Sequence, residues 1–167
     1  MPANQDHALD VIAIGRSSVD LYGQQIGSRL EDIATFSKSV GGCPANIAVG
    51  TARLGLKSGL ITGVGAEQMG RFIIEQCARE GVATQGIKID KERLTALVLL
   101  AVEDEGVSPM IFYRPDCADM AITEDDVDEA FVRSSKSVLV SGTHFSRPNT
   151  AAAQLKAMRI AKANGGK

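Results

Sequence analysis

Apolar residues follow two different spacings along this chain, and the two alternate. Three runs are almost continuously apolar, which is typical of strands buried in a parallel sheet that is covered on both faces: residues 9–15, 58–64 and 137–140. A shorter strand is expected at residues 86–89. Elsewhere, apolar residues recur every three or four positions and predict helices: residues 44–55, 69–81, 123–133 and 149–164. Strands that alternate with helices predict an α/β fold with a mainly parallel sheet flanked by helices.

Three segments break this rhythm. Residues 35–40 alternate between polar and apolar, as a strand with one solvent-facing side does, and a polar stretch containing Gly23 and Gly27 precedes them. Residues 94–102 and 109–113 flank a turn at 103–106 and predict a hairpin. We expect these segments to form a small separate β-sheet, a lid over about residues 23–40 and 94–115, set on one domain.

The last two predicted helices are each preceded by a residue that commonly caps a helix N-terminus. Thr123 precedes a run of acidic residues, and Asn149 precedes the final helix. A threonine or asparagine side chain at this position accepts a hydrogen bond from a free N–H of the first helical turn. We therefore expect Thr123 and Asn149 to cap these two helices, and Ala151, Leu155 and Met158 to share one face of the last helix.

The amino-acid composition excludes several classes of function for this protein. The 167 residues are 44% hydrophobic and 23% charged, the mix of a soluble globular protein. Lys and Arg number 18 against 20 Asp and Glu, which argues against a nucleic-acid partner. Neither a membrane span nor a basic–apolar export signal is predicted. Three cysteines without C-x-x-C spacing fit a reducing compartment, so we expect a cytoplasmic protein without a membrane partner or a metal site of its own.

Two candidate ligand-binding motifs lie near the start of the chain, and ligands of α/β folds bind beyond the carboxyl ends of strands. Asp20 follows the first strand, where its carboxylate can accept hydrogen bonds from a polyol; capping a turn is its alternative role. In Gly41-Gly42-Cys43-Pro44-Ala45-Asn46, Gly41 and Gly42 allow a ligand close to the backbone at a helix N-terminus. Asn46 can donate and accept hydrogen bonds, although an ordinary turn before a helix is the alternative. The phosphate-binding spacing G-x-x-x-x-G-K-[ST] is absent.

A third candidate motif is Phe112-Tyr113-Arg114, at the end of the predicted hairpin. Arg114 can hold a carboxylate through two parallel hydrogen bonds, and Tyr113 can pack on or hydrogen-bond the ligand. The alternative is an exposed arginine at a strand end. His144 follows the strand at 137–140 and is interpreted as a loop histidine, because no carboxylate partner is evident. No catalytic residue is assigned, since neither a Ser-His-Asp set nor a Cys-His pair follows from the spacing.

Five short motifs occur in a fixed order: 12–15 with Asp20, 41–48, 54–55, 64–70 and 80–82. Over about residues 9–167 they resemble the ribokinase-like (PfkB) carbohydrate kinases. One departure is Gly65-Ala66-Glu67, where that family often has Gly-Asp-Asp. The resemblance implies a ribokinase-like fold and transfer of the ATP γ-phosphate to a sugar hydroxyl, with Mg²⁺ as a further cofactor. It also implies a homodimer formed through the lid sheet, and a sugar held by four residues: Asp20, Gly41, Gly42 and Asn46.

Three further segments resemble the kinases of keto-deoxy sugar acids within that family: residues 14–23, 113–120 and 141–148. This closer resemblance implies that Phe112, Tyr113 and Arg114 contact a sugar acid of inositol catabolism. A kinase of 2-keto-3-deoxygluconate, ribose or fructose, and a non-catalytic sugar-binding protein, are the alternatives.

The catalytic part of that family is not found in this sequence. Its Gly-Ala-Gly-Asp block supplies the general base and the anion hole, and neither this block nor most of the nucleotide site occurs in the 167 residues. The chain stops at a predicted helix C-cap, where an α/β domain would next form a strand. We therefore expect residues 1–167 to be the substrate-binding, N-terminal part of a longer kinase, with the catalytic residues beyond Lys167.

Overall fold

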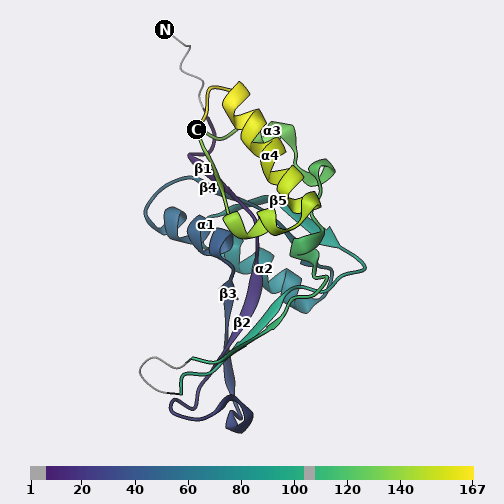
Figure 1. Ribbon diagram of the computed structural model, residues 1–167. Coiled ribbons are helices and arrows are strands. Elements are labelled where there is room, and N and C mark those ends of the chain that lie inside the picture. Colours follow the sequence, from purple (N-terminus) through teal and green to yellow (C-terminus); the bar gives the residue numbers. More distant parts are fainter. Residues whose placement is uncertain (1–6, 104–107) are drawn as a thin grey trace.

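Four parallel strands form the central sheet of the computed structural model, which describes residues 7–103 and 108–167 (Figure 1). The order β5-β4-β1-β8 joins four strands: β1 (Val11–Ile14), β4 (Ser58–Gly65), β5 (Ala83–Asp90) and β8 (Val138–Val140). All their pairings are parallel. The α/β fold is thus confirmed, and each of the three continuous apolar runs contains a strand.

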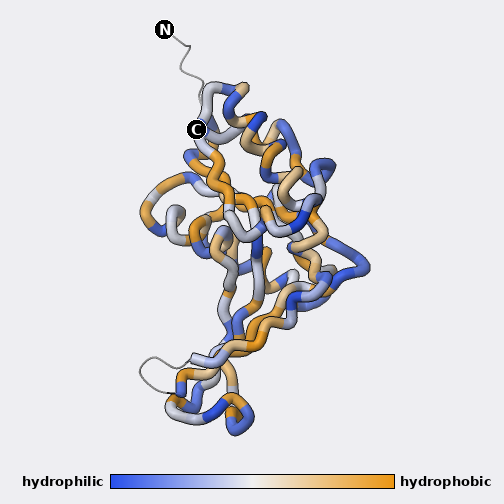
Figure 2. Tube along the Cα trace, in the orientation of Figure 1, coloured by the Kyte–Doolittle hydropathy of each residue, from blue (hydrophilic) through white to orange (hydrophobic). Residues whose placement is uncertain are grey.

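Helices cover both faces of this sheet. On one face lie α1 (Cys43–Arg53) and α2 (Gln68–Arg79), and on the other α3 (Glu129–Arg133) and α4 (Pro148–Ala163) (Figure 1). Successive strand residues feed opposite cores: Ile12 and Ile14 pack toward α4, whereas Ala13 packs toward α1. Figure 2 shows the apolar residues gathered along these strands. This two-sided burial explains why the strand sequences are continuously apolar.

A second sheet, here called the lid, extends away from the helices at the lower end of Figure 1. Its order β3-β2-β6-β7 joins four strands: β2 (Ser18–Gly23), β3 (Phe36–Gly41), β6 (Leu97–Leu100) and β7 (Met110–Tyr113). The predicted hairpin is confirmed, since β6 and β7 are antiparallel. Residues 104–106 of its predicted turn lie outside the described residues.

The lid contains one strand that the sequence did not predict. Strand β2 pairs with both β3 and β6, so the lid sheet begins at Ser18 rather than near residue 23. Its side chains alternate between two environments: Val19 is fully buried, whereas Asp20 and Tyr22 are not. A six-residue strand that contains Asp20 and Gly23, residue types that are uncommon in strands, gives only a weak signal in the sequence.

The helix predicted over residues 123–133 is wrong in its continuity. A 3₁₀ turn spans Glu124–Asp126, the next two residues are extended, and a new helix, α3, then begins. The carboxylate of Asp128 accepts hydrogen bonds from the N–H groups of Ala130 and Phe131 (2.8 and 3.2 Å), and it therefore caps this second start.

The expected cap at Asn149 is wrong as well, because α4 begins one residue earlier, at Pro148. The Asn149 amide instead donates to the carbonyl oxygens of Met120 and Ile122, both at 2.9 Å. It thereby ties α4 to the segment that follows the lid.

Candidate functional site

Asp20 and Gly41 meet where β2 and β3 leave the body of the protein. The Ser18 hydroxyl donates a 2.8 Å hydrogen bond to Oδ1 of Asp20, and Ser18 faces Gly41 in the β2–β3 register. A Cβ added to Gly41 would overlap the carboxylate carbon and both oxygens of Asp20. The Asp20 carboxylate thus lies directly on the Gly41 backbone, and any larger residue at position 41 has to displace it.

Gly42 positions the start of α1 against the turn after β1. Its φ of +94° lies in the region that favours glycine. A Cβ at this position would lie 2.5 Å from the Arg16 carbonyl oxygen and 2.8 Å from the Ser17 Cα. Gly42 is therefore required for the close approach of two backbone segments at the carboxyl end of β1.

Asn46 lies in the first turn of α1 with an exposed side chain. It lines a cavity of about 350 Å³ between β3, α1 and α2, together with Ser39. Ser39 is the cross-strand neighbour of Asp20. Ser39 on β3 therefore lies next to both residues: it lines the same cavity as Asn46 and pairs with Asp20 in the lid sheet.

The strand register separates Phe112 from Tyr113, because adjacent strand residues point to opposite faces. Phe112 pairs with Val98, which in turn pairs with Asp20, so these three residues share one face of the lid. Tyr113 pairs with Leu97 on the other face, where it lines a separate cavity of about 660 Å³. The three residues Phe112, Tyr113 and Arg114 therefore do not all lie on the same face of the lid sheet.

Arg114 turns toward the face of Asp20 and is largely buried. Its guanidinium carbon lies 5.9 Å from the centre of the Phe112 ring. Its side chain is 15% exposed, and Nη2 lies 3.7 Å from Oδ2 of the fully buried Asp119. The alternative role as a solvent-exposed arginine is wrong.

Two further residues complete this cluster: Arg16, which the sequence analysis did not single out, and His144, which it interpreted as a loop histidine. Arg16, in the turn after β1, places Nε 3.5 Å from the same Asp119 oxygen. His144, in the 3₁₀ turn Gly142–Ser146 after β8, is 1% exposed, and its carbonyl oxygen accepts the Thr150 hydroxyl. Since β1 and β8 are parallel neighbours, their carboxyl ends bring Arg16 and His144 to the same edge of the sheet.

The charges in this cluster influence one another. Burial lowers the pKa of Arg114 and nearby Arg16 lowers it further, whereas Asp119 and Asp20 raise it. Burial raises the pKa of Asp119, and the two guanidinium groups oppose this shift. Burial, and then Arg16 and Arg114, lower the pKa of His144 to about 4. At neutral pH the imidazole is therefore neutral beside two guanidinium groups.

Several polar atoms of the cluster are buried without a hydrogen bond to any residue that the structure describes: Nε and Nη2 of Arg114, Oδ1 of Asp119 and Nε2 of His144. Buried polar groups are nearly always paired in folded proteins. Such a concentration of free donors and acceptors beside Asp20 is typical of a site that pairs them with a ligand. A ligand with hydroxyl groups and a negative charge fits it, because carboxylates accept from hydroxyls and guanidinium groups pair with anions.

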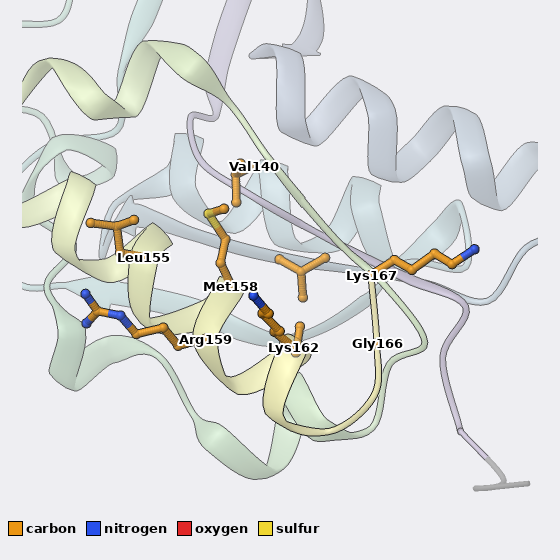
Figure 3. Close-up of a pocket in the computed structure, with 9 residues that line it drawn as sticks. Val140, Leu155, Met158, Arg159, Lys162, Gly166 and Lys167 are labelled. Carbon is orange, nitrogen blue, oxygen red and sulfur yellow. The ribbon is translucent and has the colours of Figure 1, made fainter. Parts of the chain in front are cut away.

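One cavity of the structure lies apart from this cluster. An apolar groove of about 500 Å³ follows β8 and α4 and contains Val140, Leu155 and Met158 (Figure 3); none of the predicted site residues lines it. In residues 7–103 and 108–167, no three or more His, Cys, Asp or Glu side chains are grouped to hold a metal ion, so we assign no metal ligand. The same residues include no helix that is long and apolar enough to cross a membrane.

The structure is thus an α/β domain with a β-sheet lid beside a buried polar cluster, the candidate ligand site. A family model described as pfkB family carbohydrate kinase matches residues 8–167, and the chain belongs to this family. The chain is 41% identical to the 5-dehydro-2-deoxygluconokinase of Halalkalibacterium halodurans over 160 aligned residues. This alignment covers 95% of the chain and 48% of that protein. The chain spans about half the length of the curated relatives it matches.

Solved structures of the same family share the fold. An uncharacterized sugar kinase from Pyrococcus horikoshii in complex with ATP matches with a TM-score of 0.83 and 30% identity, over 92% of this chain and 50% of that one. A putative ribokinase II from E. coli in complex with ATP and Mg²⁺ matches with a TM-score of 0.87 and 26% identity, over 95% of this chain and 51% of that one. The ribokinase-like fold expected from the sequence is confirmed.

Proposed function

We propose that this chain is the substrate-binding part of a cytoplasmic kinase that transfers the γ-phosphate of ATP to a sugar acid, 5-dehydro-2-deoxy-D-gluconate, in inositol catabolism. The observation that carries the proposal is the buried guanidinium of Arg114 on the face of the lid that bears Asp20, where two of its nitrogens make no hydrogen bond to the residues that the structure describes. The names of the curated relatives and the ATP complexes of the structural neighbours support it.

In this proposal each side chain has a simple role. Asp20 accepts hydrogen bonds from substrate hydroxyls, Asn46 adds a donor or acceptor at the rim, and Gly41 leaves room for the Asp20 carboxylate. Arg114 forms two parallel hydrogen bonds to the substrate carboxylate, and Phe112 packs beside it. Tyr113, on the opposite face of the lid, takes no part in this binding mode.

The remaining chemistry is assigned to the part of the kinase outside this chain. ATP supplies the phosphoryl group, and the general base, the anion hole and the Mg²⁺ site are proposed to lie beyond Lys167. The residues of this chain bind and orient the sugar acid, and closure of the lid excludes water from it. Water exclusion strengthens the charge-assisted contacts of Arg114.

The lid also supports a homodimer as part of the proposal. Strand β7 is an edge strand, and its four residues are exposed: Met110, Ile111, Phe112 and Tyr113. Ile111 and Tyr113 share the face opposite to Asp20. A second copy that covers this face would bury apolar side chains without blocking the site.

Phosphoryl transfer by the full-length protein tests the function. With ATP and 5-dehydro-2-deoxy-D-gluconate, we expect ADP release and a product heavier by one phosphate group. The isolated 167-residue chain should give no turnover, because the proposed base and anion hole are outside it. Absence of the phosphorylated acid with the full-length protein, or turnover by the isolated chain, would contradict the proposal.

A further inference from the structure

One carboxylate in the candidate site is shared by two guanidinium groups from different parts of the fold. Arg16 approaches Oδ2 of Asp119 from the turn after β1 (Nε at 3.5 Å), and Arg114 approaches the same oxygen from the end of the lid strand β7 (Nη2 at 3.7 Å). The Asp119 side chain is fully buried, while those of Arg16 and Arg114 are 22% and 15% exposed. Asp119 thus lies at the junction between body and lid.

The charges of this trio do not cancel. One carboxylate balances one guanidinium, so one positive charge remains in a mostly buried position, where an unpaired charge is strongly unfavourable. Both contacts are also longer than the roughly 2.7–2.9 Å of a strong charge-assisted hydrogen bond. Two Arg114 nitrogens and Oδ1 of Asp119 make no hydrogen bond within the described part of the chain.

Within the described part of the chain, Asp119 is the only carboxylate that forms an ion pair with either guanidinium group. His144 is neutral at neutral pH, because burial and the charges of Arg16 and Arg114 lower its pKa to about 4. Asp20 influences Arg114 electrostatically, yet among the described residues no ion pair joins Asp20 to either arginine. Its Oδ1 instead accepts the Ser18 hydroxyl. The site therefore has an excess of guanidinium donors while the Asp20 carboxylate stays available to hydroxyl groups.

We propose that Arg16 and Arg114 together form a subsite for the carboxylate of the sugar acid, and that Asp119 is the positioning residue that holds the two guanidinium groups side by side. The proposal rests on the proposed function for the identity of the acid. Arg16 is then a specificity-determining residue that acts from the body, while Arg114 acts from the lid. A carboxylate bound by both connects lid and body, so anionic substrates favour the closed lid.

Equilibrium binding of two matched ligands to the full-length protein tests the subsite without phosphoryl transfer. The ligands are D-gluconate and D-glucitol, which differ at the carboxylate carbon, measured by titration calorimetry. The unaltered protein should prefer gluconate. Arg16→Met should weaken gluconate binding about ten- to hundredfold and leave glucitol binding nearly unchanged, because a charge-assisted contact is lost. Arg16→Lys should restore only part of the preference.

Asp119→Asn removes the shared charge but keeps the side-chain shape. It should lower the gluconate preference about tenfold, and adding Arg16→Met to it should have a smaller effect than Arg16→Met alone, because the two act as a unit. Arg133→Met removes a 45% exposed arginine paired with Glu129 on α3 and serves as the control that should leave both affinities unchanged. Thermal melts of all variants report on folding.

Each possible binding result either supports or contradicts the proposed carboxylate subsite. An unchanged gluconate preference in Arg16→Met, or equal loss of both ligands, would overturn it, as would an unaltered protein that binds both ligands equally or neither. Selective loss of gluconate supports the subsite even if the acid is not phosphorylated, in which case only the proposed function fails. Phosphorylation of the acid with no effect of Arg16→Met retains the function and rejects the subsite.

Discussion

The carboxylate of Asp20 occupies the space that a Cβ on Gly41 would fill. The two residues come from neighbouring antiparallel strands of the lid, and Ser18, which faces Gly41 in the register, donates a hydrogen bond to the same carboxylate. The position of Asp20 therefore depends on the absence of a side chain at residue 41.

Substituting Gly41→Ala in the full-length protein should displace the Asp20 carboxylate. We expect kcat/KM for the sugar acid to fall about as much as in Asp20→Ala, roughly 5- to 150-fold for the loss of 1–3 kcal/mol of hydrogen bonding. Gly50→Ala is the matched control, since a Cβ at Gly50 in α1 meets nothing within 4 Å. That change should leave activity intact and slightly raise the Tm. Full activity in Gly41→Ala would show that the Asp20 position is unimportant.

The proposed sugar-binding roles of Asp20 and Asn46 predict that substitution of either residue lowers the affinity for the substrate. Asp20→Ala and Asn46→Ala should each raise KM, because substrate hydroxyls lose a partner, with an effect of about 1–3 kcal/mol at Asp20 and less at the exposed Asn46. Steady-state kinetics of both variants provide the measurement. If kcat/KM is unchanged in both, the substrate lies elsewhere.

Arg114 should determine the preference for an acid over a neutral sugar. Arg114→Met keeps most of the packing of the side-chain stem but removes the donors, so kcat/KM for the acid should fall about 10- to 100-fold, equivalent to 1.5–3 kcal/mol. Activity on neutral sugars should change little, and Arg114→Lys should recover only part of the loss, because an ammonium group cannot form the two-pronged contact. An equal loss on acid and neutral sugars would instead indicate a role in folding, which a thermal melt would reveal.

His144 predicts a pH dependence of stability. Its pKa is lowered from 6.5 to about 4 by burial and then by Arg16 and Arg114, so on acidification the unfolded chain takes up the proton first. The stability contribution is therefore complete above pH 6.5 and is lost as the pH falls toward 4, by up to about 3 kcal/mol. Denaturant unfolding of the full-length protein between pH 7 and 4 should show this loss, and His144→Gln should lack it. Parallel curves for the two proteins would contradict the prediction.

The regular parts of this fold could be predicted from hydrophobic pattern alone. Residues 58–64 are apolar because β4 is buried on both faces. Gly41-Gly42 precedes α1 because Gly41 leaves room for the Asp20 carboxylate and Gly42 allows close contact with the backbone of Arg16 and Ser17. Strand β2 was missed because one of its faces carries Ser18 and Asp20 toward the site, which weakens the hydrophobic pattern. Polar residues of the candidate site thus weakened the sequence signal of the strand that carries them.

The buried charge cluster could not be predicted in the same way. Arg16 and Asp119 are 103 positions apart in the sequence, and their contact forms only when the turn after β1 and the segment after the lid fold against each other. Charged residues are usually exposed, so the sequence offers no reason to bury Asp119 or Arg114. His144 was interpreted as a loop histidine for want of a carboxylate partner, whereas its neighbours are two arginines. The position of His144 after β8, at the carboxyl edge of the sheet, was the one sequence feature that indicated the candidate site.

Internal competition between sugars tests the central claim most directly. The full-length protein is given limiting ATP with equimolar 5-dehydro-2-deoxy-D-gluconate, 2-keto-3-deoxygluconate, fructose and ribose, and the phosphorylated products are quantified by mass spectrometry. Their ratio reports the relative kcat/KM values. The account predicts that the phosphorylated 5-dehydro-2-deoxy-D-gluconate predominates over the neutral sugar phosphates by at least about tenfold, the size of one charge-assisted contact. Predominance of fructose or ribose phosphate, or the absence of any sugar phosphate, would contradict it.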